Sequence, residues 1–205
     1  TKEIKTEVEY VNRSISAIEY TVKNIASNAG LLYDEKDYLP EDKTRQYLAS
    51  LLLDSQEVYA VSGGFGVWFE PYAFYNNNKD FAVLVYKDLI NNNLVVKWHD
   101  QSGLENYHQN EWYNQLIPNE EAKKDIYNRK KVFWSMPAKL DFGTEARLIT
   151  NIGAYIYNSQ NKMVGIATIG WQMSDFVRTL EHINISPNSK LLLADIKYNK
   201  IVTYT

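Results

Sequence analysis

The sequence predicts an α+β fold in which a long N-terminal helix precedes an antiparallel sheet served by further helices. Three observations indicate this. A heptad pattern covers the first thirty residues, short apolar runs separated by turn residues follow, and two long apolar runs lie within residues 146–171. With 205 residues, 45% of them hydrophobic, the chain is long enough to bury a substantial core.

The first thirty residues predict one long helix, because apolar side chains recur at alternating spacings of four and three with charged residues between them. The apolar positions are Ile4, Val8, Val11, Ile15, Ile18, Val22, Ile25 and Ala29. Gly30 is expected to end the helix. Two interpretations of this stripe stay open: the helix packs on its own domain, or it pairs with the same helix of a second copy. One helix can also do both.

A second helix is expected to begin near Pro40. Proline suits the first helical turn, and the acidic Glu41 and Asp42 favour the positive end of the helix dipole. The stripe that this helix is expected to bury consists of Tyr47, Leu48, Leu51 and Leu52.

Short apolar runs typical of strands follow the second helix. They span residues 58–61, 65–69, 81–86 and 94–98. Two helical segments come next, one holding Trp112 and Tyr113 and one running from Glu120 to about Tyr127. Two long runs, 146–157 and 163–171, are expected to form the central antiparallel pair of the sheet. A short helix from Ser174 to about His182 and a strand pair at 191–196 and 201–204 complete the pattern.

Composition excludes several classes of function. The net charge is -3 and no basic stripe with interleaved aromatic residues is present, so nucleic acid is not expected as a partner. The absence of cysteine excludes disulfide bonds, thiol catalysis and cysteine metal sites. The histidines, His99, His108 and His182, are not paired at metal-ligand spacing, so neither a metal nor another cofactor is expected. No apolar run reaches the roughly eighteen residues that a membrane-spanning helix needs.

Two polar segments invite a catalytic interpretation. Residues 62–66 look faintly like a phosphate loop, but they lack its lysine and lead into a strand, so a glycine bend between strands is preferred. Asp141 and Glu145 flank Gly143, and two carboxylates can perform acid–base catalysis. Nothing else in the sequence converges on them. A turn is therefore preferred, and an enzyme acting on a small molecule through Asp141 and Glu145 is only a remote alternative.

Aromatic residues indicate a binding function more clearly. The chain has 16 tyrosines and 5 tryptophans, and several of them lie beside amide and carboxylate residues. They are Trp68 and Tyr72 at the end of a strand-like run, Trp112 and Tyr113 after a loop rich in Asn, Glu and Gln, and Trp134 before the long strands. Aromatic faces near such polar groups suit a pocket for a small polar ligand, although each of these side chains can also belong to the core.

These motifs, in this order, resemble those of double Cache (dCache) sensor domains, which occur in bacterial and archaeal chemoreceptors, sensor histidine kinases and diguanylate cyclases. The resemblance is carried by Gly-Gly-Phe-Gly-Val-Trp-Phe-Glu-Pro-Tyr-Ala-Phe at 63–74, Tyr107, Trp112-Tyr113, Trp-Ser-Met-Pro at 134–137, and the run 163–171 followed by Ser174. It covers roughly residues 1–205. It implies a PAS-like antiparallel sheet, the Cache module, with a ligand held between the sheet and overlying loops.

The resemblance also implies three segments. Residues 1–38 are the long stalk helix and its link, 39–186 the membrane-distal Cache module, and 187–205 the first strands of a truncated membrane-proximal module. The first helix is expected to rise from a preceding transmembrane segment and to line a homodimer. The chain is then the extracytoplasmic sensory part, periplasmic or extracellular, of a receptor in the cell membrane, and not itself an enzyme. The main alternative is a ligandless sensor that responds to a partner protein.

Trp112 and Tyr113 match the family's ligand-contacting pair. The further candidates for ligand binding are Asn110, Tyr72, Trp134, Asp141 and Tyr155. The amino-acid-binding version of the family has an arginine where this chain has Asn110 and an acidic residue where it has Gly170. That version also has a tyrosine where this chain has Glu105, and a Pro-Tyr pair where this chain has Pro137-Ala138. Without these anchors for a carboxylate and an ammonium group, the small-molecule ligand is not expected to be a free α-amino acid.

Overall fold

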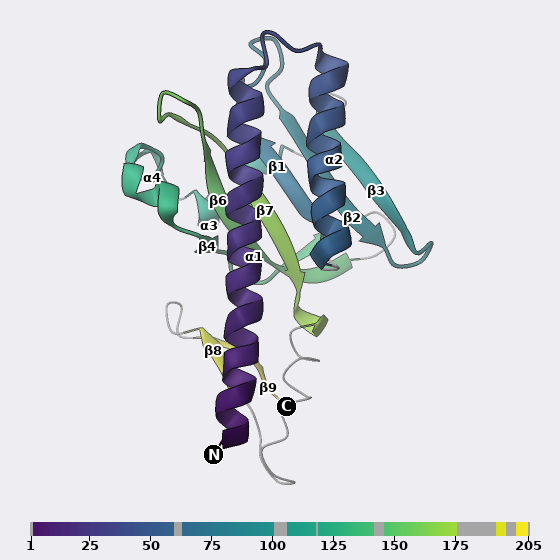
Figure 1. Ribbon diagram of the computed structural model, residues 1–205, viewed down its shortest axis with the longest axis vertical. Helices are drawn as coiled ribbons and strands as arrows, with labels where there is room; N and C mark the ends of the chain where they lie inside the picture. Colours follow the sequence, from purple (N-terminus) through teal and green to yellow (C-terminus); the bar gives the residue numbers. More distant parts are fainter. Residues whose placement is uncertain are drawn as a thin grey trace.

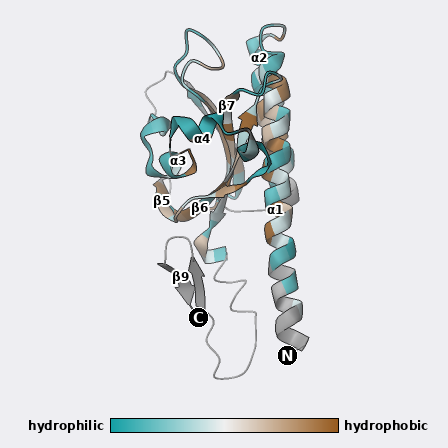
Figure 2. Cartoon of the chain, turned by 90° about the vertical axis from the view of Figure 1, so that its left-hand side faces the viewer, coloured by the Kyte–Doolittle hydropathy of each residue, from teal (hydrophilic) through white to brown (hydrophobic). Residues whose placement is uncertain are grey.

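The structure, a computed structural model, describes residues 2–59, 63–100, 106–117, 119–141, 146–175, 192–195 and 200–204. Two long helices cover one face of an antiparallel sheet, and short helical segments cover the other face (Figure 1 and Figure 2). The predicted α+β fold, a long N-terminal helix followed by a PAS-like sheet, is confirmed. Within the described part of the chain, no helix combines the length and apolar character needed to cross a membrane.

The N-terminal helix, α1 (Lys2–Asp34), packs its apolar stripe against the two longest strands, β6 (Ala146–Tyr157) and β7 (Met163–Gln172). The buried positions, each at most 6% exposed, are Ile18, Val22, Ile25 and Ala29. Packing of the helix on its own domain is therefore confirmed for this part of the stripe. The side chains of Ile4, Val8 and Val11 are outside the described set, so pairing with a second copy stays a prediction.

Gly30 does not end this helix, and the expectation that it does is wrong: α1 continues to Asp34. Glycine stands here for a packing reason. A Cβ atom at position 30 would collide with the carbonyl oxygen of Tyr157, so glycine is what lets the helix lie this close to β6.

Replacing Gly30 with alanine is expected to destabilise the domain by about 1–2 kcal/mol. Alanine gains about 1 kcal/mol of helix propensity over glycine, but the collision with the backbone of β6 costs about 2–3 kcal/mol. Urea denaturation measures the change in the free energy of unfolding, with Asn28→Ala on the exposed face of α1 as the control. A Gly30→Ala variant at least as stable as the wild type would contradict the close contact.

The second helix, α2 (Glu41–Tyr59), begins directly after Pro40, as predicted, and packs on β1 (Phe65–Phe69) and β2 (Phe81–Asp88). Leu48 and Leu52 are fully buried, whereas Tyr47, expected in the same stripe, is 52% exposed. The strand expected at 58–61 is wrong for residues 58 and 59, which end α2; residues 60–62 are outside the described ranges. A four-residue apolar run does not distinguish a strand from the end of a helix.

Seven strands form one sheet in the order β3-β2-β1-β7-β6-β4, with β5 also pairing with β6. The remaining strands are β3 (Asn93–Asp100), β4 (Phe133–Trp134) and β5 (Ala138–Asp141). The predicted pairing of the two longest strands is confirmed, and β7 joins them to β1. Phe65, Val67 and Phe69 of β1 pack under the long helices, whereas Trp68 packs under the short ones. Because both faces are buried, this strand is continuously apolar.

Residues 106–117 and 119–131, here termed the outer layer, cover the sheet face opposite α1 (Figure 2). The outer layer contains η1 (Tyr107–Gln109), α3 (Glu111–Leu116), α4 (Glu120–Lys124) and η2 (Ile126–Lys130). The helical segment expected around Trp112 is confirmed. The one expected from Glu120 is split in two, because the side chain of Asp125 accepts a hydrogen bond from the N–H of Tyr127 and starts a new turn.

After β7 the structure describes one helical turn at 173–175; the rest of the helix predicted up to His182 is outside the described ranges. The predicted terminal strand pair is confirmed as β8 (Leu192–Asp195) and β9 (Lys200–Tyr204), an antiparallel sheet of its own. Its assignment to a second module, and the boundaries after residues 38 and 186, stay predictions.

Candidate functional site

A cavity of about 80 Å³ lies between the sheet and the outer layer. Its walls come from strands far apart in the sequence, including β1, β3, β6 and β7, and from η1 and α3. The cavity is on the face of the sheet opposite α1, at the position that the family resemblance implies for a ligand.

Aromatic rings form one wall of this cavity. The ring of Trp68, near the end of β1, lies 5.1 Å from the ring of Trp112 and 5.2 Å from those of His99 and Tyr107. The Trp68 indole Nε1 donates a hydrogen bond of 2.8 Å to Oγ1 of Thr168, which fixes its ring. The other three rings are inclined by 52–61° to that of Trp68, so the wall they form is apolar but angular, and the indole donor is already satisfied.

The side chain of Asn151 lines the same cavity and carries an unsatisfied donor. Asn151 is 6% exposed, and its Nδ2 atom has no hydrogen-bond partner. Its backbone is fixed: its N–H donates to Oγ of Ser135 and its carbonyl oxygen accepts from the N–H of Ser135, each at 2.9 Å. A buried donor without a partner costs about 1–3 kcal/mol, so a bound molecule that accepts this hydrogen bond is stabilised.

The charged group at the cavity is a cation. Lys97 of β3 lines it, and none of the described lining residues carries a carboxylate. A molecule rich in hydrogen-bond acceptors is therefore favoured there over one that carries an ammonium group. In the part of the chain that the structure describes, no three His, Asp or Glu side chains gather as a metal site requires.

Glycines form one end of the cavity. The N–H of Gly170 donates to the carbonyl oxygen of Gly64 at 2.8 Å, and a Cβ atom at position 170 would lie 2.7 Å from the carbonyl oxygen of Gly63. Backbone atoms thus fill the space that a side chain at position 170 needs. The φ angle of Gly64 is 89°, so the predicted glycine bend before the strand is confirmed, although the element that precedes it is helix α2 and not a strand.

Several hydrogen bonds attach the outer layer to the last residue of β1 and to Glu70 after it, among them one of 3.1 Å between Nε2 of His108 and the carbonyl oxygen of Phe69. The hydroxyl of Tyr107 donates to the carbonyl oxygen of Phe69, and that of Tyr113 donates to Oε1 of Glu70, both at 2.6 Å. The ammonium group of Lys123 donates to Oε2 of Glu70 at 2.6 Å. Glu70 therefore joins both α3 and α4 to the sheet and holds α3 over the cavity.

The protonation states fit these bonds. Burial raises the pKa of the Tyr113 hydroxyl, and the neighbouring charge of Glu70 adds to this effect, so the phenol stays a neutral donor. Burial lowers the pKa of Lys123, but its hydrogen bonds to Glu120 and Glu70 outweigh burial and raise the pKa overall. The ion pair therefore persists at neutral pH.

Two of the predicted ligand-binding residues, Asn110 and Trp112, line the cavity. Tyr113 lies beside Trp112 with its hydroxyl already engaged. Tyr155 lies farther along β6, where its hydroxyl donates to the carbonyl oxygen of Leu116 at 2.7 Å. The structure thus brings Asn110 and Trp112 to the cavity and leaves the two tyrosines outside its lining.

The other three candidates lie elsewhere. Tyr72 is 54% exposed in the loop after β1. Trp134 packs against the core under the long helices, and its indole Nε1 donates to Glu19 of α1 at 3.2 Å. Asp141 is the last residue of β5; its side chain and all of Glu145 are outside the described set, so the hypothesis of a catalytic carboxylate pair is not tested.

Sequence reasoning missed three polar lining residues, Asn151, Thr168 and Lys97. A partial signal was present, because each is a polar residue with apolar neighbours in a run predicted to form a strand. The face on which such a residue points follows from strand pairing, and the pairing becomes visible only in the folded structure.

Residues 46–177 match the family described as methyl-accepting chemotaxis protein-like, first PDC sensor domain. This span contains most of α2, the whole seven-stranded sheet and the outer layer, and therefore the cavity. No curated protein matches the chain.

Solved structures with the same fold include three receptor domains. The one named methyl-accepting chemotaxis protein X is 13% identical, with a TM-score of 0.70 over 93% of this chain and 67% of that one. The periplasmic sensory domain of the Campylobacter jejuni chemoreceptor Tlp1 is 16% identical, with a TM-score of 0.61 over 92% and 66%. The ligand-binding domain of C. jejuni Tlp3, in complex with L-norvaline, is 13% identical, with a TM-score of 0.54 over 99% and 64%.

The chain spans about two thirds of the length of each of these structures, between 64% and 67%. At such low sequence identity, the likeness shows a shared fold and nothing about the ligand of this chain.

Proposed function

The chain belongs to the methyl-accepting chemotaxis protein-like family of first PDC sensor domains, and from this premise we propose that it senses a small polar ligand in the cavity between the sheet and the outer layer. The observation that carries the proposal is the unpartnered Nδ2 atom of Asn151, a buried donor in a cavity that aromatic rings also line. We propose further that the ligand is an organic acid without an ammonium group.

Charge and space support this choice of ligand. Lys97 and Asn151 offer donors to acceptor atoms, and no described lining residue offers a carboxylate to an ammonium group. The acidic residue of amino-acid-binding relatives would fall at Gly170, where the backbone of Gly63 leaves no room for a side chain. The L-norvaline bound by Tlp3 is therefore a poor guide to the ligand of this chain.

The size of the cavity supports a mechanism of sensing. A volume of about 80 Å³ is smaller than the roughly 150 Å³ of a cavity that accepts benzene. A ligand of more than a few atoms then requires the outer layer to move outwards at α3. Free and bound states differ in shape, which is the condition for a ligand to shift an equilibrium between two states.

The signal is proposed to leave the domain through α1, which packs on β6 and β7 beneath the cavity. We place the domain outside the cytoplasm, in a receptor anchored in the membrane and dimeric through α1. The periplasmic location of the sensory domain of Tlp1 supports this placement by analogy.

A thermal-shift screen of the purified chain tests the proposed ligand class. The panel contains organic acids, amino acids, amines, purines and sugars. A ligand that binds only the folded state adds about 2.7 kcal/mol of stability at a hundredfold excess over its dissociation constant. We expect organic acids to raise the melting temperature and α-amino acids to leave it unchanged.

The Asn151→Leu variant locates the binding. Leucine has a similar volume and removes an unsatisfied buried donor, so this variant is expected to fold at least as well as the wild type. Its melting temperature is expected not to respond to a monocarboxylic acid that stabilises the wild type, whereas Asn24→Leu on the exposed face of α1 responds normally. An undiminished response in Asn151→Leu would show that the ligand does not bind in this cavity. No response across the panel would favour the ligandless, partner-protein alternative.

A further inference from the structure

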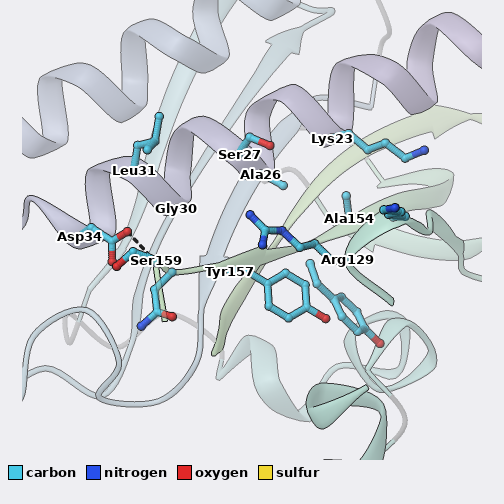
Figure 3. Close-up of a pocket in the computed structure, with 13 residues that line it drawn as sticks. Lys23, Ala26, Ser27, Gly30, Leu31, Asp34, Arg129, Ala154, Tyr157 and Ser159 are labelled. Atoms are coloured by element: carbon cyan, nitrogen blue, oxygen red, sulfur yellow. Dashed lines mark hydrogen bonds between the residues drawn. The ribbon is translucent and has the colours of Figure 1, made fainter. Parts of the chain in front are cut away.

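A second and larger cavity, here termed the edge groove, lies at the β6 edge of the sheet, between α1 and η2 of the outer layer. It has a volume of about 480 Å³ and runs between α1, the C-terminal half of β6, η2 and the turn after β6 (Figure 3). Binding sites for small molecules usually measure about 300–1,000 Å³. The edge groove is therefore large enough for a small ligand without any movement of the chain.

The groove exists because part of β6 lacks an outer neighbour. β4 pairs with Ile152 and Gly153, and β5 pairs with residues 146–149, so the described strands leave residues 154–157 open at this edge. Helix α1 approaches that edge closely at Gly30, which packs against the carbonyl oxygen of Tyr157. The rings of Tyr155 and Tyr157 belong to the lining of the groove.

Positive charge dominates the lining. Lys23 of α1 and Arg129 and Lys130 of η2 all line the groove, and no carboxylate among the described residues forms an ion pair with any of them. Asp34, the lining carboxylate, lies at one end of the groove and accepts the N–H of Ser159 at 2.8 Å (Figure 3). Three cations from two segments a hundred residues apart in the chain thus share one cavity.

Arg129 and Lys23 offer hydrogen-bond donors to a ligand in the groove. Figure 3 shows the guanidinium group of Arg129 extending towards α1, with Ser27 across from it and Lys23 farther along the same helix. One Arg129 nitrogen donates to Oδ1 of Asn161 at 2.5 Å, which steadies the side chain and leaves its other N–H groups available. The hydroxyl of Tyr157 is already engaged with the carbonyl oxygen of Asp125 at 3.3 Å.

We propose that the edge groove binds a small anion with at least two acceptor oxygens, such as a phosphate monoester or a dicarboxylate. Arg129 supplies a planar fork that matches such groups, and Lys23 and Lys130 supply point charges. An anion bound here bridges α1 to η2 and the edge of β6. The bound anion would therefore bias the position of α1, and it would do so from a site separate from the cavity lined by Asn151.

Isothermal titration calorimetry with glycerol phosphate and with succinate tests this proposal, with chloride at equal ionic strength as the reference. We expect saturable binding of at least one of the two that weakens as NaCl is added, because Arg129 and Lys130 are exposed and Lys23 is only half-buried. Arg129→Gln is expected to weaken it about tenfold or more. Lys23→Gln is expected to weaken it as well.

Two controls make the result specific. Lys139→Gln removes the same charge from an exposed position on β5 and is expected to leave binding unchanged. Asn151→Leu alters the other cavity and is also expected to leave anion binding in the edge groove unchanged. Failure of this inference is therefore distinguishable from failure of the proposed function. The proposal would be overturned if neither compound gave more heat of binding than the chloride reference. It would also be overturned if wild type and Arg129→Gln bound with the same affinity.

Discussion

Truncation of Trp112 to alanine is expected to lower the free energy of unfolding by about 3–5 kcal/mol and to abolish ligand binding in the cavity. Trp112 is 5% exposed, and its ring lies 5.1 Å from that of Trp68 and 5.6 Å from that of Tyr113. Removing the indole ring leaves a packing defect between α3 and the sheet and takes away part of the cavity wall. Both effects have the same cause, because this residue is at once a core residue and a lining residue.

Urea denaturation measures the stability change, and titration with the stabilising organic acid measures binding. Tyr127→Ala, at a position 78% exposed in the same outer layer, is the control and is expected to change stability by less than about 0.5 kcal/mol. Trp112→Phe retains an aromatic wall and is expected to keep most of the stability. A loss below about 1 kcal/mol in Trp112→Ala would contradict the packing described for α3.

Replacement of Glu70 with alanine is expected to cost about 2–3 kcal/mol and to loosen the outer layer. The side chains of Glu70 and Lys123 are 15% and 23% exposed, so their ion pair is largely shielded from water. Removal of the carboxylate leaves the ammonium group of Lys123 and the hydroxyl of Tyr113 without their acceptor. Breaking one partner of a fully buried pair costs about 3–5 kcal/mol, and partial exposure reduces the cost here.

Hydrogen exchange of the backbone amides in α3 and α4 reports the loosening directly. Glu120→Gln is a matched control, because Glu120 also binds Lys123 at 2.6 Å but is 75% exposed. That variant is expected to change stability by less than about 0.5 kcal/mol and to leave exchange unaltered. Equal effects of Glu70→Ala and Glu120→Gln would show that Glu70 does not anchor the outer layer.

Much of the fold was predictable from local patterns. The heptad stripe predicts α1, Pro40 with two acidic residues predicts the start of α2, and two long apolar runs predict the central strand pair. The errors arise where tertiary contacts override local signals. Gly30 is a common helix terminator, yet here it remains in the helix because β6 leaves no room for a side chain.

The site was predictable only in part. Trp112 and Asn110 follow from the family motifs, and both line the cavity. No motif identifies Asn151, because its place in the cavity depends on strand register. Asn151 of β6 pairs with Gly170 of β7, and this register turns its side chain towards the outer layer. Trp134 is a residue type common in ligand contacts, but it faces α1 and donates a hydrogen bond to Glu19.

Hydrogen–deuterium exchange with and without the stabilising organic acid tests the central claim most directly. If the domain senses its ligand between the sheet and the outer layer, exchange should slow at residues 106–117 and should change along α1, which packs on the other face of the same strands. Asn151→Leu should abolish both changes. Slowed exchange confined to the residues of the edge groove, or no change in the outer layer while the ligand is bound, would contradict the claim.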